Sequence, residues 1–83
     1  MRVMRIESKP RAVKNLETLD RPVARRVWEK IRGLENNLAG DVKRLTNFTP
    51  EYRLRVGDYR VLFEIEGDPV IIYRIKHRSR AYS

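Results

Sequence analysis

The chain has 83 residues, with 19 lysines and arginines against 11 aspartates and glutamates, a formal net charge of +8. A chain of this length forms one domain, residues 1–83, because two separate cores would each be too small to fold unaided. A small domain buries only about 60% of its unfolded surface, which leaves little room for a deep, enclosed ligand pocket. We therefore expect the chain to act through its surface.

The residue types that are scarce exclude several classes of function. Absence of cysteine excludes disulfides and thiolate metal sites, and the single histidine excludes a histidine-rich metal centre. No apolar run approaches the roughly 20 residues of a membrane helix, and the segment Met1–Arg5 lacks the apolar centre of a secretory signal. The expectation is a cytoplasmic protein with no metal, no small-molecule cofactor and no membrane partner.

The positive charge is the first indication of a partner. Most of the cations are arginines, and a planar guanidinium binds phosphate in a bidentate way that an ammonium group cannot. An excess of this size favours a polyanion, with nucleic acid as the first candidate. Simple solubility, or a basic face that docks on an acidic protein, would also explain the charge.

The N-terminal part predicts a strand followed by a short helix. Residues 2–7 alternate loosely between apolar and polar types, which is typical of a strand. Ser8 is a favoured helix-capping residue, and Pro10 fits a first helical turn. Apolar residues at helical spacing then indicate a helix that ends near Leu19.

A second, longer helix follows. Asp20 can cap it, with Pro22 in its first turn, and Gly40 is a natural stop signal. We assign Trp28, which flanks the apolar stripe, to the core. The stripe consists of Val23, Val27, Ile31, Leu34 and Leu38.

The spacing of apolar residues changes from helical to alternating in the second half. Residues 41–51 carry turn chemistry and predict a loop, and alternation starts at Tyr52. We assign Tyr52, Tyr59 and Tyr73 to the core. The pattern predicts a three-stranded meander at 52–56, 59–66 and 70–76, with turns at 57–58 and 67–69. The predicted fold class is α+β in the order β-α-α-β-β-β, with both helices on one face of a small, mostly antiparallel sheet.

The hairpin register sets like charges side by side. A two-residue turn at 57–58 places Arg55 opposite Arg60, and a three-residue second turn places Arg60 opposite Lys76. Arg53 lies on the same face, and these strands offer no carboxylate at the facing positions. Such a row costs electrostatic energy that an anionic ligand would relieve. A two-residue second turn would instead put Ile75 opposite Arg60, and exposed arginines can also simply extend into water.

The C-terminal segment strengthens the case for nucleic acid. Four cations follow one another with no acid between them, and an aromatic side chain, Tyr82, follows: the cations are Arg74, Lys76, Arg78 and Arg80. Cations hold phosphates while an aromatic ring stacks on an unpaired base, as in single-strand binding. Alternatively, Tyr82 closes an edge of the core, and His77 is structural or solvated.

Two motifs resemble those of RelE-type toxins of the RelE/ParE superfamily. Residues 52–63, YRLRVGDYRVLF, are similar to the hairpin of that family, and residues 77–82, HRSRAY, to its C-terminal signature. The order of elements matches as well. The resemblance implies a metal-independent endoribonuclease that cleaves mRNA in the ribosomal A site and pairs with a cognate antitoxin in a hetero-oligomer. It also implies attack by a ribose 2′-OH, which yields a 2′,3′-cyclic phosphate.

The resemblance also implies roles for individual residues. Arg60 and Arg78 would contact the scissile phosphate, Arg78 would neutralise or protonate the leaving oxygen, and Tyr82 would stack on a displaced base. RNA contacts would extend over Arg53, Arg55, Arg74, Lys76 and Arg80.

The general base is left open by these assignments. Arg53 and Arg55 stand where some relatives carry lysines, and arginine cannot serve as a base because it does not lose its proton in proteins. Histidine titrates near neutral pH, so His77 is the one conventional candidate for proton transfer. Two alternatives stay open: a ParE-like poison of DNA gyrase without RNase activity, and an inactive relative that binds RNA or antitoxin.

Overall fold

A computed structural model describes residues 5–36, 38–47 and 49–80. Its elements follow one another in this order: β1 (Ile6–Ser8), α1 (Pro10–Glu17), α2 (Arg21–Gly33), β2 (Asp41–Arg44), β3 (Tyr52–Val56), β4 (Tyr59–Ile65), β5 (Val70–His77) and a short 3-10 helix, η1 (Arg78–Arg80).

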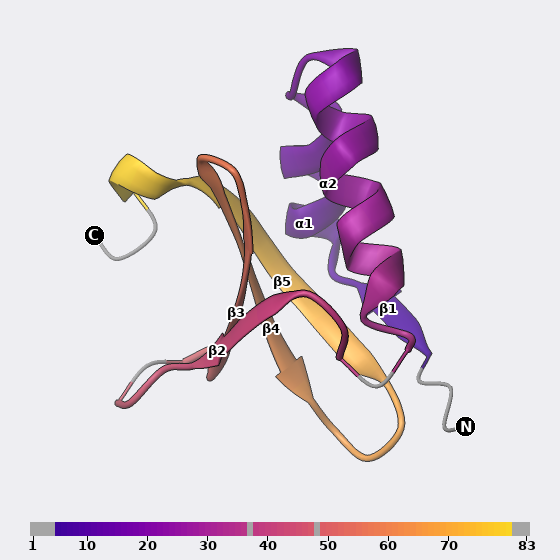
Figure 1. Ribbon diagram of the computed structural model, residues 1–83, viewed down its shortest axis with the longest axis vertical. Coiled ribbons are helices and arrows are strands. Elements are labelled where there is room, and N and C mark those ends of the chain that lie inside the picture. Colours follow the sequence, from indigo (N-terminus) through magenta and orange to yellow (C-terminus); the bar gives the residue numbers. More distant parts are fainter. Residues whose placement is uncertain (1–4, 37, 48, 81–83) are drawn as a thin grey trace.

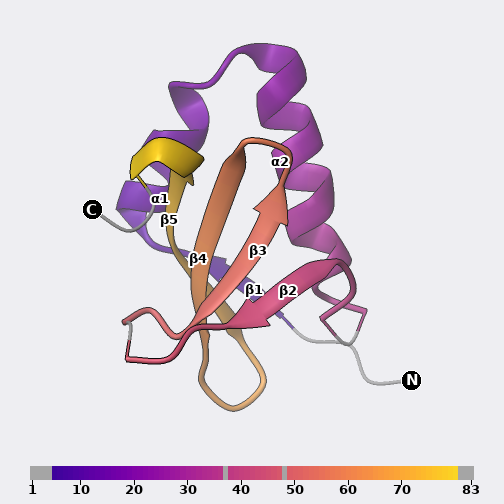
Figure 2. The ribbon, with the colours of Figure 1, turned by 60° about the vertical axis from the view of Figure 1, so that its left-hand side comes forward.

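The strands form one sheet in the order β1-β5-β4-β3-β2. Strands β2 to β5 pair antiparallel in chain order, whereas β1 pairs parallel with β5. Helices α1 and α2 lie together on one face of the sheet (Figure 1). The opposite face, here called the open face, turns toward the viewer in Figure 2 and is covered by no helix of the described residues. The predicted α+β class and helix placement are confirmed.

The core lies between the helices and the covered face of the sheet. Val27, Ile31 and Leu34 of the predicted stripe are fully buried there, together with Ala12 of α1. The sheet contributes Leu54, Val56, Val61, Phe63, Val70, Ile72 and Ile75. Along β3 these residues alternate with arginines, whereas in β4 and β5 the intervening Leu62 and Ile71 are also apolar and buried. Burial of one set directs the other to the open face.

The prediction of a loop over 41–51 is wrong at its start, where β2 adds a strand. Val42 pairs with Leu54 of β3, and the ladder runs from Asp41 to Arg44. The strand is too short for its sequence pattern to stand out. Gly40, which precedes it, has a φ of 122°, and a Cβ there would lie 3.0 Å from the Leu54 side chain. A larger residue would therefore be strained as the chain enters β2.

The helix boundaries differ from the predicted ones. Ser8 belongs to β1, and Lys9 is the N-cap residue of α1. Asp20 stands at the N-cap of α2 as predicted, although its side chain makes no capping hydrogen bond. Helix α2 ends at Gly33, not near Gly40, because the chain tightens after it: the amide of Leu34 already bonds to the carbonyl three residues back.

Trp28 is not a core residue, contrary to the prediction. Its side chain is 40% exposed, whereas Val27 and Ile31 are almost completely buried. Successive helical residues are about 100° apart, so a residue next to Val27 sits at the edge of the stripe. Trp28 there borders an apolar groove of about 310 Å³, whose walls include Val13 of α1.

The second turn of the meander also differs from the prediction. Ile65, not Glu66, pairs with Val70, and the Glu66 amide donates to the Pro69 carbonyl across a longer connection. A β-bulge then shifts the register by one residue, because Tyr73 has no partner on β4. The shift restores the predicted pairing of Arg60 with Lys76. Tyr73 itself lies outside the core cluster, while Tyr52 and Tyr59 pack against it half-buried.

Candidate nucleic-acid interface

A row of three cations crosses the open face of the sheet. Arg55 of β3 pairs with Arg60 of β4, and Arg60 pairs with Lys76 of β5, as the sequence predicts. Directly opposed side chains in a sheet lie about 5 Å apart at their Cβ atoms, so the three cations share one small region.

A second row lies two residues along the same strands. Leu62 of β4 pairs with Arg53 on one side and with Arg74 on the other. Two residues of a strand span about 6.6 Å, which sets the spacing between the rows. We call these two rows, with Lys43 at their edge, the basic face; it comprises Lys43, Arg53, Arg55, Arg60, Arg74 and Lys76.

Strand β2 brings two charges that the sequence analysis missed. Asp41 pairs with Arg55, and Lys43 pairs with Arg53. The Asp41 carboxylate also lies 4.0 Å from the guanidinium of Arg53. The expectation that no carboxylate neighbours the arginines is therefore wrong at this edge, because the sequence pattern predicts a loop where β2 lies. A short alternation of Asp41, Val42 and Lys43 is the only sequence signal of this strand.

Two arginines of the basic face are held in contrasting ways. Arg60 Nη1 donates to the carbonyls of Gly57 and Tyr59, at 3.0 and 3.1 Å, which ties its guanidinium to the hairpin turn. Arg53 is packed into the surface instead: its side chain is 12% exposed, and its Nε is buried with no hydrogen-bond partner among the described residues. Arg55, which pairs with Arg60 in the first row, is exposed.

Helix η1 attaches to the tip of the same hairpin. The Arg78 amide donates to the Asp58 carbonyl at 2.6 Å, and Figure 2 shows η1 beside the β3–β4 turn. Arg78 is exposed there. The backbone thus brings Arg78 near the end of the row that holds Arg60. Arg80 ends η1, and Tyr82 lies outside the described residues.

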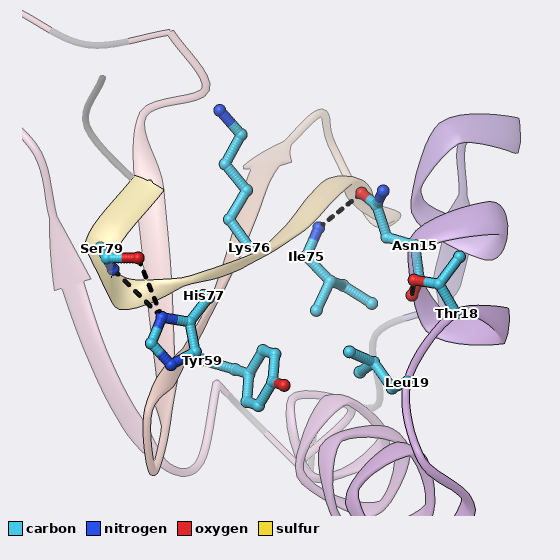
Figure 3. Close-up of a pocket in the computed structure, with 8 residues that line it drawn as sticks. All are labelled: Asn15, Thr18, Leu19, Tyr59, Ile75, Lys76, His77 and Ser79. Carbon is cyan, nitrogen blue, oxygen red and sulfur yellow. Dashed lines mark hydrogen bonds between the residues drawn. The ribbon is translucent and has the colours of Figure 1, made fainter.

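His77 lies on the opposite side of β5 from the basic face. It pairs with Tyr59, and the two rings meet edge to face with centroids 5.4 Å apart. Both line a groove of about 650 Å³ that Asn15, Thr18 and Leu19 border from the α1 side (Figure 3). Asn15 anchors this wall, because its Oδ1 accepts a hydrogen bond from the Ile75 amide at 3.1 Å. The structure therefore places Arg53, Arg55, Arg60 and Arg74 on one face of the sheet and the His77 ring on the other.

Arg44 stands apart from the basic face because it is neutralised. Its Nε and Nη2 lie 2.7 and 2.5 Å from Glu51 Oε1. The hydrogen bond to Glu51, with the attraction of its charge, raises the pKa of Arg44 above the ordinary value. This pair ties the end of β2 to the start of β3 and leaves no cation for a ligand.

The described residues contain no cluster of side chains that could hold a metal ion. No helix within the described ranges is long and apolar enough to cross a membrane.

A family model described as the ParE toxin of type II toxin-antitoxin system, parDE, matches residues 6–82, so the chain belongs to this toxin family. The resemblance to the RelE/ParE superfamily is thereby confirmed. Among individual relatives, the chain is 40% identical over 47 residues to Toxin RelE3 of Methanocaldococcus jannaschii. That match spans 57% of this chain and 53% of the relative, so about half the length of the relative is covered.

Two solved structures share both the fold and part of the sequence. One is the RelB-RelE antitoxin-toxin complex from Methanococcus jannaschii, with a TM-score of 0.75, 30% identity, and coverage of 92% of this chain and 94% of that one. The other is the archaeal RelE-RelB complex from Pyrococcus horikoshii, also with a TM-score of 0.75 and 30% identity, covering 95% and 99%.

Proposed function

We propose that the chain is the toxin of a type II toxin–antitoxin pair and acts as a metal-independent endoribonuclease on mRNA in the ribosomal A site. The observation that carries the proposal is the row of Arg55, Arg60 and Lys76 across the open face. Arg78 extends this row, because its amide is bonded to the tip of the same hairpin. A sheet that gathers cations at one end of an uncovered face suits a polyanion with an exposed backbone.

The chemistry needs charge stabilisation more than it needs a metal. A ribose 2′-oxygen attacks the neighbouring phosphorus, the bond to the 5′-oxygen breaks, and the products are a 2′,3′-cyclic phosphate and a 5′-hydroxyl. Negative charge grows on the phosphoryl oxygens, and pre-positioned cations such as Arg60 and Arg78 would stabilise it. The 2′-OH loses its proton to a group of the RNA, the ribosome or water, since an arginine cannot accept one. The leaving 5′-oxygen gains a proton from water or through Arg78.

The basic face also supports an antitoxin as partner. The two solved relatives are complexes of RelE with RelB. A segment that neutralises the cations would be acidic or amphipathic, and one that is disordered when free can wrap a small domain as it folds. We propose that such a segment inhibits the toxin by covering the arginines or by displacing elements next to them.

The proposal predicts that Arg60→Ala and Arg78→Ala each relieve growth arrest and reduce mRNA cleavage. Loss of one group that stabilises the transition state costs about 10²–10³ in rate. Arg25→Ala, an exposed arginine of α2 on the other side of the sheet, is the matched control and should stay toxic. The measurement is a map of message 5′ ends after a short pulse of expression, with Tyr82→Ala tested alongside.

Cuts within translated codons that disappear in the two arginine variants support the proposal. Intact messages combined with inhibited DNA supercoiling would support the gyrase poison instead. Full toxicity of both Arg60→Ala and Arg78→Ala would contradict the assignment of these two arginines to the active site.

A further inference from the structure

The junction of β5 and η1 depends on a histidine side chain. His77 is the last residue of β5, and Arg78 is the first of η1. The Ser79 amide donates to His77 Nδ1 at 3.4 Å, and Ser79 Oγ lies 3.1 Å from the same nitrogen (Figure 3). The first amides of a helical turn have no partner within the turn and need an acceptor from outside. The imidazole supplies it here.

This contact fixes the state of the ring. A backbone N–H can only donate, so Nδ1 must present its lone pair, and the proton of the neutral ring then sits on Nε2. A protonated imidazole carries N–H groups at both positions and cannot accept from Ser79. The edge-to-face contact with Tyr59 holds the ring from its other side.

The same short helix is also held by the hairpin. The Arg78 amide bonds to the Asp58 carbonyl, while Arg60 bonds to the Gly57 carbonyl one residue earlier. Consecutive amides of η1, those of Arg78 and Ser79, are thus fixed by the hairpin tip and by the His77 ring. Without the ring, only one of these two attachments would hold Arg78 in place.

We infer that His77 is a positioning residue, which holds Arg78 beside Arg60 through its Nδ1 contact with Ser79, and not a proton-transfer residue. The expected effect of His77 on the cleavage rate rests on the proposed function. Its expected effect on the geometry of η1 does not. The ring faces the α1 side of the sheet, on the other side of β5 from the residue that pairs with Arg60. The ionisable groups that line the groove with it are Tyr59 from β4 and Lys76 from β5. The α1 wall of the groove contributes uncharged Asn15, Thr18 and Leu19.

The test compares side chains that do and do not keep the acceptor. In His77→Asn, Oδ1 takes the place of Nδ1 and accepts without titrating. In His77→Gln, the acceptor moves outward toward the Nε2 position, and His77→Ala has none. We expect His77→Asn to keep most of the cleavage rate, whereas Gln and Ala lose up to about 10²-fold because a phosphate-contacting group is displaced. Equal losses in Asn and Ala would overturn the inference in favour of proton transfer.

Two further readouts separate the inference from the proposed function. Hydrogen exchange of the Ser79 amide in the isolated chain should be slow in wild type and His77→Asn, and fast in the Gln and Ala variants. Identical exchange in all four proteins would refute the inference whether or not RNA is cut. If no RNA is cut, the proposed function fails, and the exchange pattern still decides the role of His77.

Discussion

Two arginines of one hairpin illustrate how differently the same side chain can be used. Arg60 Nη1 donates hydrogen bonds to the carbonyls of Gly57 and Tyr59, which leaves the other N–H groups of its guanidinium for a ligand. Arg53 lies largely buried, and the Asp41 carboxylate at 4.0 Å is at the limit of an ion pair. A buried donor without an acceptor costs about 1–3 kcal/mol. The unpartnered Nε of Arg53 therefore costs stability that an acceptor on a bound ligand would offset.

At this residue scale we predict that Arg53→Met makes the chain more stable and a poorer RNA binder. Methionine keeps the buried stem and removes the unpartnered Nε, so the free energy of unfolding should rise by about 1 kcal/mol. Urea denaturation measures it. The control is Arg55→Met on the same strand, where an exposed side chain should change stability by no more than about 0.5 kcal/mol. A loss of stability in Arg53→Met would show that its guanidinium supports the fold.

Among the elements, α2 shows how narrow its buried stripe is. Ile31 is 1% exposed, while Trp28 is 40% exposed, although both are large apolar side chains. The stripe points at the sheet, and the edge that holds Trp28 borders a shallow groove with α1. Burial, and not side-chain size, should therefore decide the energetics of this helix.

We accordingly expect Ile31→Ala to lower the free energy of unfolding by about 2–5 kcal/mol. Trp28→Ala removes a larger side chain but should cost less than about 2 kcal/mol, because much of the ring is already in water. Thermal or urea unfolding of the two variants under one set of conditions tests the order. The reverse order would place Trp28 in the core.

On the scale of the whole molecule, cations predominate at one end of the open face, where Asp41 is the acidic neighbour described above, and two glutamates lie at the other. The basic face lies toward the β3–β4 turn, whereas Glu64 of β4 and Glu7 of β1 both pair with Ile71 further along the sheet. The Glu64 carboxylate accepts a hydrogen bond from the Glu51 amide and so stays at that end. A polyanion would be attracted to one end of the face and repelled from the other.

This arrangement of charge predicts how steeply the affinity for RNA depends on the salt concentration. Each cation that neutralises a phosphate of a single strand contributes about −0.7 to the slope of log affinity against log salt. Arg55→Gln should therefore flatten the slope for a short RNA oligonucleotide by about that amount. Arg25→Gln, on α2, has the same charge change and should leave the slope as in wild type. Equal slopes in all three proteins would mean that the bound RNA avoids the basic face.

Whether the sequence predicts a pairing correctly depends on whether that pairing is set by local or by long-range contacts. The Arg55–Arg60 pairing follows from a two-residue turn, which is local chemistry, and the sequence predicts it correctly. The Arg60–Lys76 pairing also agrees, although only because the bulge at Tyr73 compensates for a longer turn than predicted. Strand β2 and its Asp41 were missed, because four residues carry too little pattern and gain their hydrogen bonds from β3.

The position of His77 shows the same limit for function. Sequence chemistry marks the only histidine as a candidate for proton transfer, but which face of β5 it takes depends on the pairing with Tyr59. Its contact with Ser79 is local, yet it becomes informative only once β5 is known to end at His77.

The parallel pairing of β1 with β5 joins the beginning of the fold to its end. Strand β1 therefore cannot pair until β5 has formed, and the row of Arg55, Arg60 and Lys76 is complete only once β5 joins the sheet. Pairing of segments so far apart in the sequence carries a loop-closure cost, so we expect this sheet to close late in folding.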